Sequence, residues 1–384
     1  MAEENNVIAQ LSDLQNIIKN RHQFRTRSYD EALAAFKETK VLIYGAGAFG
    51  KEMLADLKSH AVPIQAFLDK NAYKINSIAD VPVYPPDEAS FTLEYRENCL
   101  VIISIVLNRE KREQIKKYLL ALGYQKIIDA QTIRAKRVPY NETDMEPNNE
   151  IIEKDAKDLL SALDLFADNH SREIYESCIN CHLRREYENA LESPNTIQYL
   201  VSNTPQNKGT SRFIDCGAYT GDTLKSLISR NTIQVYCGFE PGLESFKMLT
   251  QTADMLPETT LCVLFPCGVG RYPHSAFFND IAGSGSISRN GTSLIHIVTL
   301  DDTLKNFNPT MIKMDIEGEE YNALQGAKKT ITQSKPDLAI CVYHRISDYW
   351  MIPLLIHSWN LGYKFYLRAH SSATMETVLY AVAP

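Results

Sequence analysis

Two glycine-rich turns, each between a predicted strand and a predicted helix, are the first features of this chain that could do chemistry. The first turn reads Gly45-x-Gly47-x-x-Gly50, and Asp69 follows about 20 residues later at the end of the next predicted strand. Glycines at these positions let a backbone approach a pyrophosphate at a helix N-terminus, and Asp69 could accept a ribose hydroxyl. Two interpretations stay open for this turn, namely a nucleotide or nucleotide-sugar site and a scaffold that binds nothing.

In the second turn a carboxylate stands at the entrance. Asp215 ends the strand before Gly217 and Gly221, so a pyrophosphate would meet like charge, whereas a cationic ligand would be attracted. S-adenosylmethionine carries an ammonium and a sulfonium and no phosphate, so its charges suit this turn. Glu240 ends the next strand, about 20 residues further on, where a carboxylate can hold both ribose hydroxyls. The alternative for Asp215 is a helix N-terminal charge satisfied by backbone amides.

We therefore predict that S-adenosylmethionine is the cofactor. The residues assigned to its site are Asp215, Gly217, Tyr219, Gly221, Thr223, Glu240, Cys267, Gly268 and Asp315.

Three later residues are candidates for the chemistry of methyl transfer. Asp315 and His344 follow two further predicted strands, and the carboxyl ends of parallel strands meet at one edge of a sheet. A sulfonium already activates its methyl group, so alignment does most of the work, but an alcohol acceptor gains from a base. We choose His344 as this base because its ordinary pKa is nearest neutrality, and Asp315 as the second choice. Glu317 would position a substrate hydroxyl.

Each of these three residues also has a structural alternative. His344 could hydrogen-bond within a loop, Asp315 could orient a ligand or lie at a helix N-terminus, and Glu317 could be an acidic first-turn residue of the following helix. Together they would make an acceptable ligand set for Mg²⁺, but nothing in their spacing demands one, so we expect no resident metal. Arg345, Arg368 and His370 would either recognise an anionic acceptor or form a solvated rim.

The elements that must position these residues form two strand–helix alternations separated by a helical stretch, which predicts two α/β units. An amphipathic helix is predicted within residues 1–38, with Ile8, Leu11, Leu14, Ile17 and Ile18 on one face. The first alternation has predicted strands at 41–44, 64–68, 100–107 and 126–129 and helices at 51–60 and 109–122. A polar linker at 139–150 and a helical stretch at 151–192 follow.

The second alternation is more regular. Predicted strands lie at 212–216, 234–239, 260–265, 311–316 and 337–343, and helices at 222–230, 242–255, 320–333 and 348–360. Thr299 is expected to cap another helix with Asp302 reaching back, and 282–293 to form a hairpin or mobile loop. Two final strands, 363–368 and 376–382, follow each other without a helix and are expected to be antiparallel.

The predicted fold is α/β, with two Rossmann-like doubly wound sheets joined by a helical connector, the second a class I methyltransferase fold with an antiparallel last strand. We assign residues 1–137 to a Rossmann-like domain with its leading helix, 138–205 to the linker and connector, and 206–384 to the methyltransferase domain.

Composition excludes several classes of protein. The chain has 384 residues, and 40 Lys and Arg against 47 Asp and Glu give a net charge of -7, which argues against a nucleic-acid partner. The longest apolar run, 100–107, is too short to span a membrane. The N-terminus also lacks the basic segment followed by an apolar segment that is typical of a secretory signal, so we expect a cytoplasmic protein. Most of the eight cysteines are read as reduced core residues. Cys178 and Cys181 precede His182 with haem-like spacing but are read as two cysteines on a helix face.

The C-terminal half also resembles a known family. FIDCGAYTGDT, GFEP, HIVTLDDTL, IKMDIEGEEYNALQGA and the YHR and ETVLYA tail, from about Phe213 to Ala383, resemble the FkbM family of S-adenosylmethionine-dependent methyltransferases. Tyr219 departs from the pattern, because the family most often has Asn there. Residues 41 to about 130 resemble, more loosely, the Rossmann-like N-terminal domain of some sugar-modifying transferases. These resemblances imply methylation of a carbohydrate hydroxyl, with small natural-product hydroxyls as the other acceptor class.

Two other functions remain as alternatives. An NAD(P)-dependent sugar oxidoreductase or epimerase could use Gly45 to Gly50, although residues 1–137 contain no Tyr-x-x-x-Lys pair for hydride transfer. A non-catalytic protein that binds a glycan precursor is the third possibility.

Overall fold

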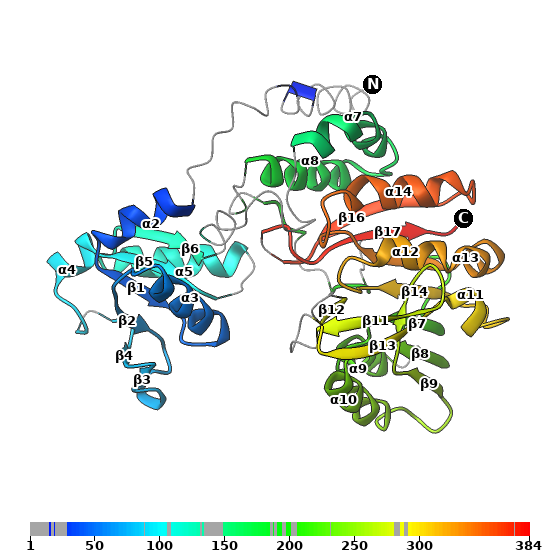
Figure 1. Ribbon diagram of the computed structural model, residues 1–384, viewed down its shortest axis with the longest axis horizontal. Helices are drawn as coiled ribbons and strands as arrows, with labels where there is room; N and C mark the ends of the chain where they lie inside the picture. The colour runs from blue at the N-terminus through cyan, green and yellow to red at the C-terminus, as the bar shows by residue number, and fades with distance from the viewer. Residues whose placement is uncertain are drawn as a thin grey trace.

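The computed structural model describes residues 15–16, 19, 29–87, 89–105, 109–130, 133, 149–184, 187, 190–193, 197–200, 206–230, 232–279, 285–287, 291–371 and 373–384. Two α/β units are separated along the chain, and helices α7 (Asn149–Leu163) and α8 (Asn169–Arg184) lie with the second unit (Figure 1). The fold class predicted from the sequence is thus confirmed. The residues proposed for the apolar face of the leading helix lie outside the described residues, as does the linker over 139–148.

The N-terminal unit is a six-stranded sheet in the order β3-β4-β2-β1-β5-β6, parallel except for β3. Both faces of the central strands are buried, which explains why they read as apolar runs. Strands β3 and β4 and helix α4 had no counterpart among the predicted elements. The strands are β1 Val41–Tyr44, β2 Ile64–Leu68, β3 Ser77–Ile78, β4 Val81–Tyr84, β5 Leu100–Ile103 and β6 Lys126–Asp129, with helices α2 Tyr29–Lys37, α3 Ala48–Ser59, η2 Ala72–Lys74, α4 Leu93–Asn98 and α5 Arg109–Ala121.

The C-terminal unit contains a seven-stranded sheet in the order β16-β17-β15-β14-β7-β8-β9, in which only β17 runs against its neighbours. The antiparallel pairing expected for the last two strands is therefore confirmed. Its strands are β7 Arg212–Cys216, β8 Val235–Phe239, β9 Leu261–Phe265, β14 Met311–Met314, β15 Asp337–Cys341, β16 Lys364–Ala369 and β17 Thr377–Val382.

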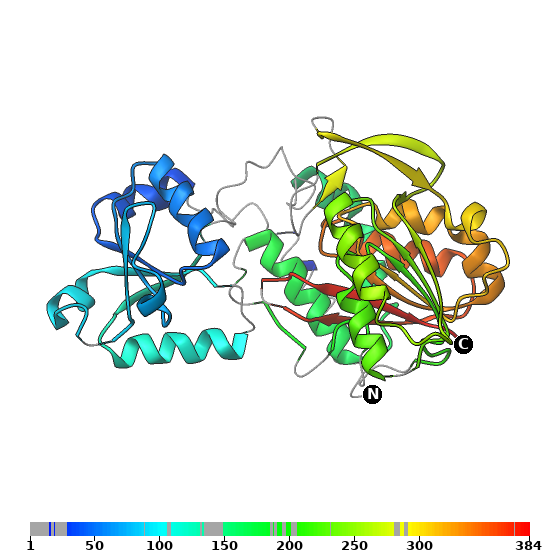
Figure 2. The same cartoon turned by 90° about the horizontal axis from the view of Figure 1, so that it is seen from below.

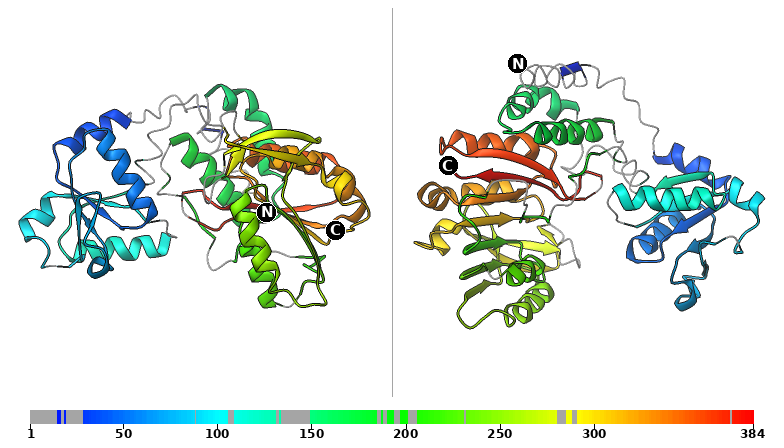
Figure 3. Two further views of the ribbon diagram at one scale, coloured as in Figure 1. Left: turned by 60° about the horizontal axis from the view of Figure 1, so that its bottom comes forward. Right: turned by 180° about the vertical axis from the view of Figure 1, so that it is seen from behind.

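Helices cover both faces of this sheet (Figure 3). Residues of β7 alternate between the two cores, with Ile214 and Cys216 facing one and Phe213 the other. Helices α7 Asn149–Leu163 and α8 Asn169–Arg184, predicted as a connector, contribute Leu159 and Tyr175 to the first core, so they are built into the C-terminal unit. The other covering helices are α9 Asp222–Arg230, α10 Leu243–Ala253, α11 Leu300–Thr303, α12 Glu320–Gln325, α13 Lys328–Ser334 and α14 Asp348–Ser358.

One helix prediction was wrong in its continuity. The predicted helix 320–333 is divided into α12 and α13 at Gly326, where a side chain would collide with the carbonyl oxygen of Gly270. The cap predicted for α11 is present, because the Thr299 hydroxyl accepts a hydrogen bond from the Asp302 amide and donates one to the Asp302 carboxylate.

A small separate sheet occupies part of the region predicted as a hairpin or loop. Strands β10 Gly268–Val269, β11 His274–Asn279, β12 Ser286–Ile287 and β13 Ser293–Val298 pair in the order β10-β13-β11-β12. Figure 2 shows this sheet, drawn in yellow, beside the seven-stranded sheet.

Within the described residues, no helix is both long and apolar enough to cross a bilayer.

Candidate active site

A cavity of about 300 Å³ opens beside the carboxyl ends of β7, β8 and β14. This is the edge of a doubly wound sheet at which ligands bind, because several loops converge there. The predicted site residues that line the cavity are Gly217, Tyr219, Glu240, Cys267, Gly268, Asp315 and Glu317. Asp215, Gly221, Thr223 and His344 lie outside this lining.

The glycine turn between β7 and α9 is fixed by close backbone packing. Gly217 has a φ of +77°, and a side chain there would lie 1.8 Å from the carbonyl oxygen of Asp315. The amides of Gly217 and Ala218 both donate to the carbonyl of Phe239. Glycine is therefore required here to bring the end of β7 against the end of β14, which sets the floor of the cavity.

Asp215 has a different position from the one predicted. Its side chain is completely buried, and Oδ1 lies 2.9 Å from Lys313 Nζ on the neighbouring strand β14. Tyr236 donates a hydrogen bond to Oδ2. Burial alone would lower the pKa of Lys313, but Asp215 and Asp315 raise it above its ordinary value, so the lysine stays charged. The Asp215 charge is thus compensated below the turn, and its side chain does not line the cavity.

Glu240 lies at the cavity, held by two backbone amides. Its carboxylate accepts hydrogen bonds from the amide of Tyr219 at 2.9 Å and from that of Gly242 at 2.7 Å. Burial raises the pKa of Glu240, although these two amide bonds oppose the shift. Each oxygen keeps a further lone pair for a hydroxyl, and the ribose-binding role of Glu240 stays a prediction.

Asp315 follows β14 and faces the cavity between two tyrosines. Tyr199 donates to Oδ2 at 2.8 Å, and Tyr343 donates to Oδ1 at 3.4 Å. Burial alone would raise the pKa of Asp315, but Lys313 and His344 outweigh it and hold the pKa below its ordinary value. A carboxylate with such a low pKa is a poor proton acceptor and a good fixed charge.

His344 is surrounded by carboxylates, and this argues against the role of base that we predicted for it. Nδ1 lies 2.9 Å from Glu320 Oε1, while Nε2 lies 3.5 Å from Asp315 Oδ1 and 3.6 Å from Glu317 Oε2. Burial alone would lower the pKa of His344, but Glu320 and the other two carboxylates raise it to about 10. The ring therefore carries its proton at neutral pH and cannot take another from a substrate.

Glu317 and Glu376 have the opposite electrostatic character. Burial raises the pKa of both carboxyls, and both line the cavity. Glu317 lies at the turn after β14 with a φ of +57°. This left-handed backbone conformation is uncommon for residues other than glycine, and residues that adopt it are often found at functional sites. Glu376 accepts a hydrogen bond from Gln198 and lies 3.5 Å from the Tyr343 hydroxyl.

Several residues of this site were missed by the sequence analysis. Lys313 had a readable signal, since it is the one charged residue in the apolar strand β14. Glu320 was assigned to a helix and Tyr199 to the connector, and neither position indicates by itself that the side chain reaches Asp315 or His344. Only the packing of α12 and of the 197–200 segment brings them there.

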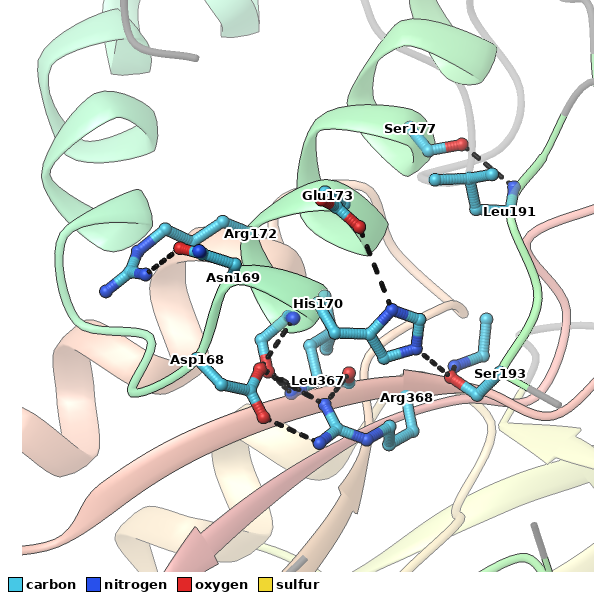
Figure 4. Close-up of polar contacts among 12 residues, drawn as sticks. Asp168, Asn169, His170, Arg172, Glu173, Ser177, Leu191, Ser193, Leu367 and Arg368 are labelled. Carbon is cyan, nitrogen blue, oxygen red and sulfur yellow. Dashed lines mark hydrogen bonds and ion pairs between the residues drawn. The ribbon is translucent and has the colours of Figure 1, made fainter. Parts of the chain in front are cut away.

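The three basic residues expected near an anionic acceptor are engaged elsewhere. Arg368 is buried and binds Asp168 at 2.7 Å, which ties β16 to the segment before α8 (Figure 4). Arg345 pairs with Glu319, and His370 is bonded to the Tyr380 hydroxyl. Arg368 is therefore neither a solvated rim residue nor open to a substrate.

The first glycine turn has a structural explanation for two of its three glycines. Gly45 has a φ of +109°, and a side chain on Gly50 would lie 2.0 Å from the Gly45 carbonyl oxygen. Around Gly47, no atom of the described residues apart from its chain neighbours lies within 4 Å of the position that a side-chain carbon would take. Asp69 accepts hydrogen bonds from the amides of Ala46 and Asn71, so its carboxylate braces the turn itself. A ligand for this turn stays a prediction.

The cysteines lie mostly in buried positions. All eight are free thiols, and Cys178 and Cys181 are buried in α8. Seven of the eight are buried and Cys262 is half-buried, which agrees with the prediction that most of them are core residues.

Comparison with known proteins points to the same unit. Residues 215–365 match the model of the methyltransferase FkbM domain. A crystal structure of a methyltransferase FkbM from Methylobacillus flagellatus KT is similar to this chain, and the match covers 98% of each chain. The TM-score of 0.67 at 21% sequence identity shows a shared fold. No curated protein matches the chain. The C-terminal unit, with its cavity at the ends of β7, β8 and β14, therefore contains a methyltransferase FkbM domain over residues 215–365.

Proposed function

We propose that this protein transfers a methyl group from S-adenosylmethionine to a hydroxyl oxygen of a sugar or glycan precursor. The observation that supports the proposal best is the match of residues 215–365 to a methyltransferase domain whose glycine turn, Glu240 and Asp315 meet at one cavity. The N-terminal resemblance to sugar-modifying transferases favours a carbohydrate acceptor.

The residues of the cavity fit this methyl donor in charge and shape. The lining contains a single lysine, Lys313, which is paired with Asp215, against six acidic residues: Asp222, Glu240, Asp315, Glu317, Glu319 and Glu376. Such a surface favours a ligand with cationic groups and disfavours a phosphate. The backbone from Gly217 to Tyr219 would cradle the donor, and Glu240 would hold its ribose hydroxyls. The electrostatic argument first made for Asp215 thus applies to the cavity wall instead.

When bound, S-adenosylmethionine supplies a methyl group on a sulfonium, whose carbon–sulfur bond breaks as the new carbon–oxygen bond forms and leaves a neutral thioether. The chain must align the acceptor hydroxyl and remove its proton. We assign the proton acceptor to Glu317, whose carboxyl lines the cavity and has a raised pKa. Asp315 stays ionised and accepts a hydrogen bond from the acceptor, while the protonated His344 stabilises both carboxylates.

The acceptor is expected to be uncharged near its reacting hydroxyl. Carboxylates and tyrosine hydroxyls on the wall can bind sugar hydroxyls, whereas an anionic group would be repelled. We place the reaction in the cytoplasm, which the eight free thiols support because that compartment keeps cysteines reduced.

Calorimetry with the full-length protein tests the donor. We expect S-adenosylmethionine to bind and Glu240→Gln to weaken this binding about 10–100-fold, because hydrogen bonds to a charged group contribute about 1.5–3 kcal/mol. Glu244→Gln is the matched control, since Glu244 is exposed on α10 and pairs with Lys247. Tight binding of NAD(H) together with no binding of S-adenosylmethionine would reverse the proposal. Mass spectrometry of glycans from cells with and without the protein would then identify the acceptor by a gain of one CH₂ unit.

A further inference from the structure

The carboxylates around His344 outnumber the positive charge beside them. Three carboxylates, of Asp315, Glu317 and Glu320, lie within 3.6 Å of its ring nitrogens. A protonated ring leaves this group with a net charge of -2, since three negative charges face one positive charge. A neutral ring with a divalent cation would leave -1. A metal ion thus neutralises the cluster better than a proton does.

Three of these side chains bring donor atoms close enough to share one ion. One donor atom each from Asp315, Glu320 and His344 lies within 4.8 Å of the others. Ligand distances of about 2.0–2.2 Å are normal for nitrogen and oxygen donors, so small side-chain adjustments would close this set around an ion. Glu320 is completely buried and His344 is 7% exposed, which distinguishes them from an ordinary surface group of acidic residues.

Two buried atoms of the group give a second, independent indication. Glu320 Oε2 and His344 Nε2 are shielded from solvent and have no hydrogen-bond partner among the described residues. Nε2 faces Asp315 and Glu317 at 3.5 and 3.6 Å, beyond the length of a good hydrogen bond. Buried polar atoms almost always have a hydrogen-bond partner, and a bound ion is one explanation for a buried polar atom that has none.

We propose that Asp315, Glu320 and His344 bind a divalent transition-metal cation at the edge of the cavity. Imidazole suits zinc, iron and nickel, and carboxylates suit manganese and magnesium, so a mixed set fits Mn²⁺, Fe²⁺ or Zn²⁺. Ca²⁺ fits poorly because it takes six to eight oxygen ligands.

The cation would deepen the proposed function, on which this part of the inference rests. Asp315 is the member of the set that lines the cavity, so an acceptor hydroxyl can approach the ion from that side. Binding to a divalent cation lowers the pKa of a hydroxyl, and the proton passes to the carboxylate of Glu317 as the oxygen takes the methyl group. With the ion bound, the imidazole would be a neutral ligand, and the cation would replace the ring proton as the positive charge beside Asp315 and Glu317.

Titration of the full-length, chelator-treated protein with Mn²⁺, followed by electron paramagnetic resonance, tests the site. We expect one strongly bound Mn²⁺ per chain, and at least about tenfold weaker binding in Glu320→Gln, the scale seen when ligands or their supporting partners are lost. Glu319→Gln is the control, because this neighbouring carboxylate also lines the cavity but pairs with Arg345. Of these two variants, Glu320→Gln should change the affinity for Mn²⁺ and Glu319→Gln should not.

A second variant guards against a folding defect, since Glu320 also accepts a hydrogen bond from the amide of Ile316. Asp315→Asn lies at the cavity and should weaken Mn²⁺ binding to a similar extent. Absence of bound Mn²⁺ in the wild type, or unchanged affinity in both variants, would overturn the metal site. The titration contains no methyl donor or acceptor, so its result is separate from the outcome of the donor calorimetry.

Discussion

Replacing Lys313 by methionine isolates the contribution of the ion pair below the glycine turn. Its Nζ atom lies 2.9 Å from Asp215 Oδ1, with the two side chains 3% and 0% exposed, and also donates to the carbonyl of Gly217 at 2.5 Å. Methionine preserves most of the volume but leaves the Asp215 charge buried without its counter-ion. Breaking a buried pair in this way costs about 3–5 kcal/mol of unfolding free energy.

Thermal unfolding followed by tryptophan fluorescence measures this loss. The two tryptophans, Trp350 and Trp359, lie in α14 and at its C-terminal end, so the signal reports on the C-terminal unit. A unit of this size loses about 2–4 °C in Tm per kcal/mol, and we expect Lys313→Met to lower Tm by roughly 6–20 °C. The double variant with Asp215→Asn should recover much of the loss, because the uncompensated charge is removed as well.

Lys247→Met provides the control for this prediction. Lys247 pairs with Glu244 at 2.6 Å on the exposed face of α10, where an ion pair contributes at most about 1 kcal/mol. If Lys313→Met proved as stable as Lys247→Met, the argument that Asp215 is neutralised by Lys313 would be refuted.

Two further predictions concern the cavity. Because the pKa of His344 is raised to about 10 from 6.5, this residue stabilises the folded state fully below about pH 6.5, and the contribution is lost as pH rises through about 10. In the presence of chelator, the Tm of the wild type should therefore fall between these two pH values, and the Tm of His344→Gln should fall much less. Equal slopes of Tm against pH for the two proteins would show that the ring is not held protonated. Glu317→Gln should lower kcat by about 10²–10⁴-fold with unchanged calorimetric affinity for the donor, because it removes the proton acceptor; a full methylation rate would exclude Glu317 from that role.

The fold was largely predictable because its main strands are covered on both faces. Residues 41–44, 64–68 and 212–216 are mostly apolar and are followed directly by Gly45, Asp69 and Gly217, and the structure has strands with the same bounds. The small sheet was harder to predict. In β11 and β13 exposed and buried residues are mixed, and their pairing across a 13-residue gap depends on contacts that a local pattern does not contain.

The site was predictable in its backbone and less so in its charges. Gly217 and Glu240 could be placed from strand–turn–helix spacing alone, since that spacing fixes which edge of the sheet they reach. The protonation of His344 could not, because it depends on Glu320, which reaches the ring through the packing of α12 against the end of β15. The ion pair of Asp215 was not predictable for a related reason, because its partner Lys313 lies about 100 residues away in sequence but on the adjacent strand.

Tyr199 has a consequence for how this enzyme can be divided. Its hydroxyl reaches Asp315, its amide donates to the Tyr380 hydroxyl, and the neighbouring Gln198 holds Glu376. All of these contacts come from residues that precede both the matched domain and the first strand of its sheet. A fragment cut at residue 206 would retain every strand of the sheet and still lose one wall of the cavity, so the smallest working piece must begin upstream of the sheet it depends on.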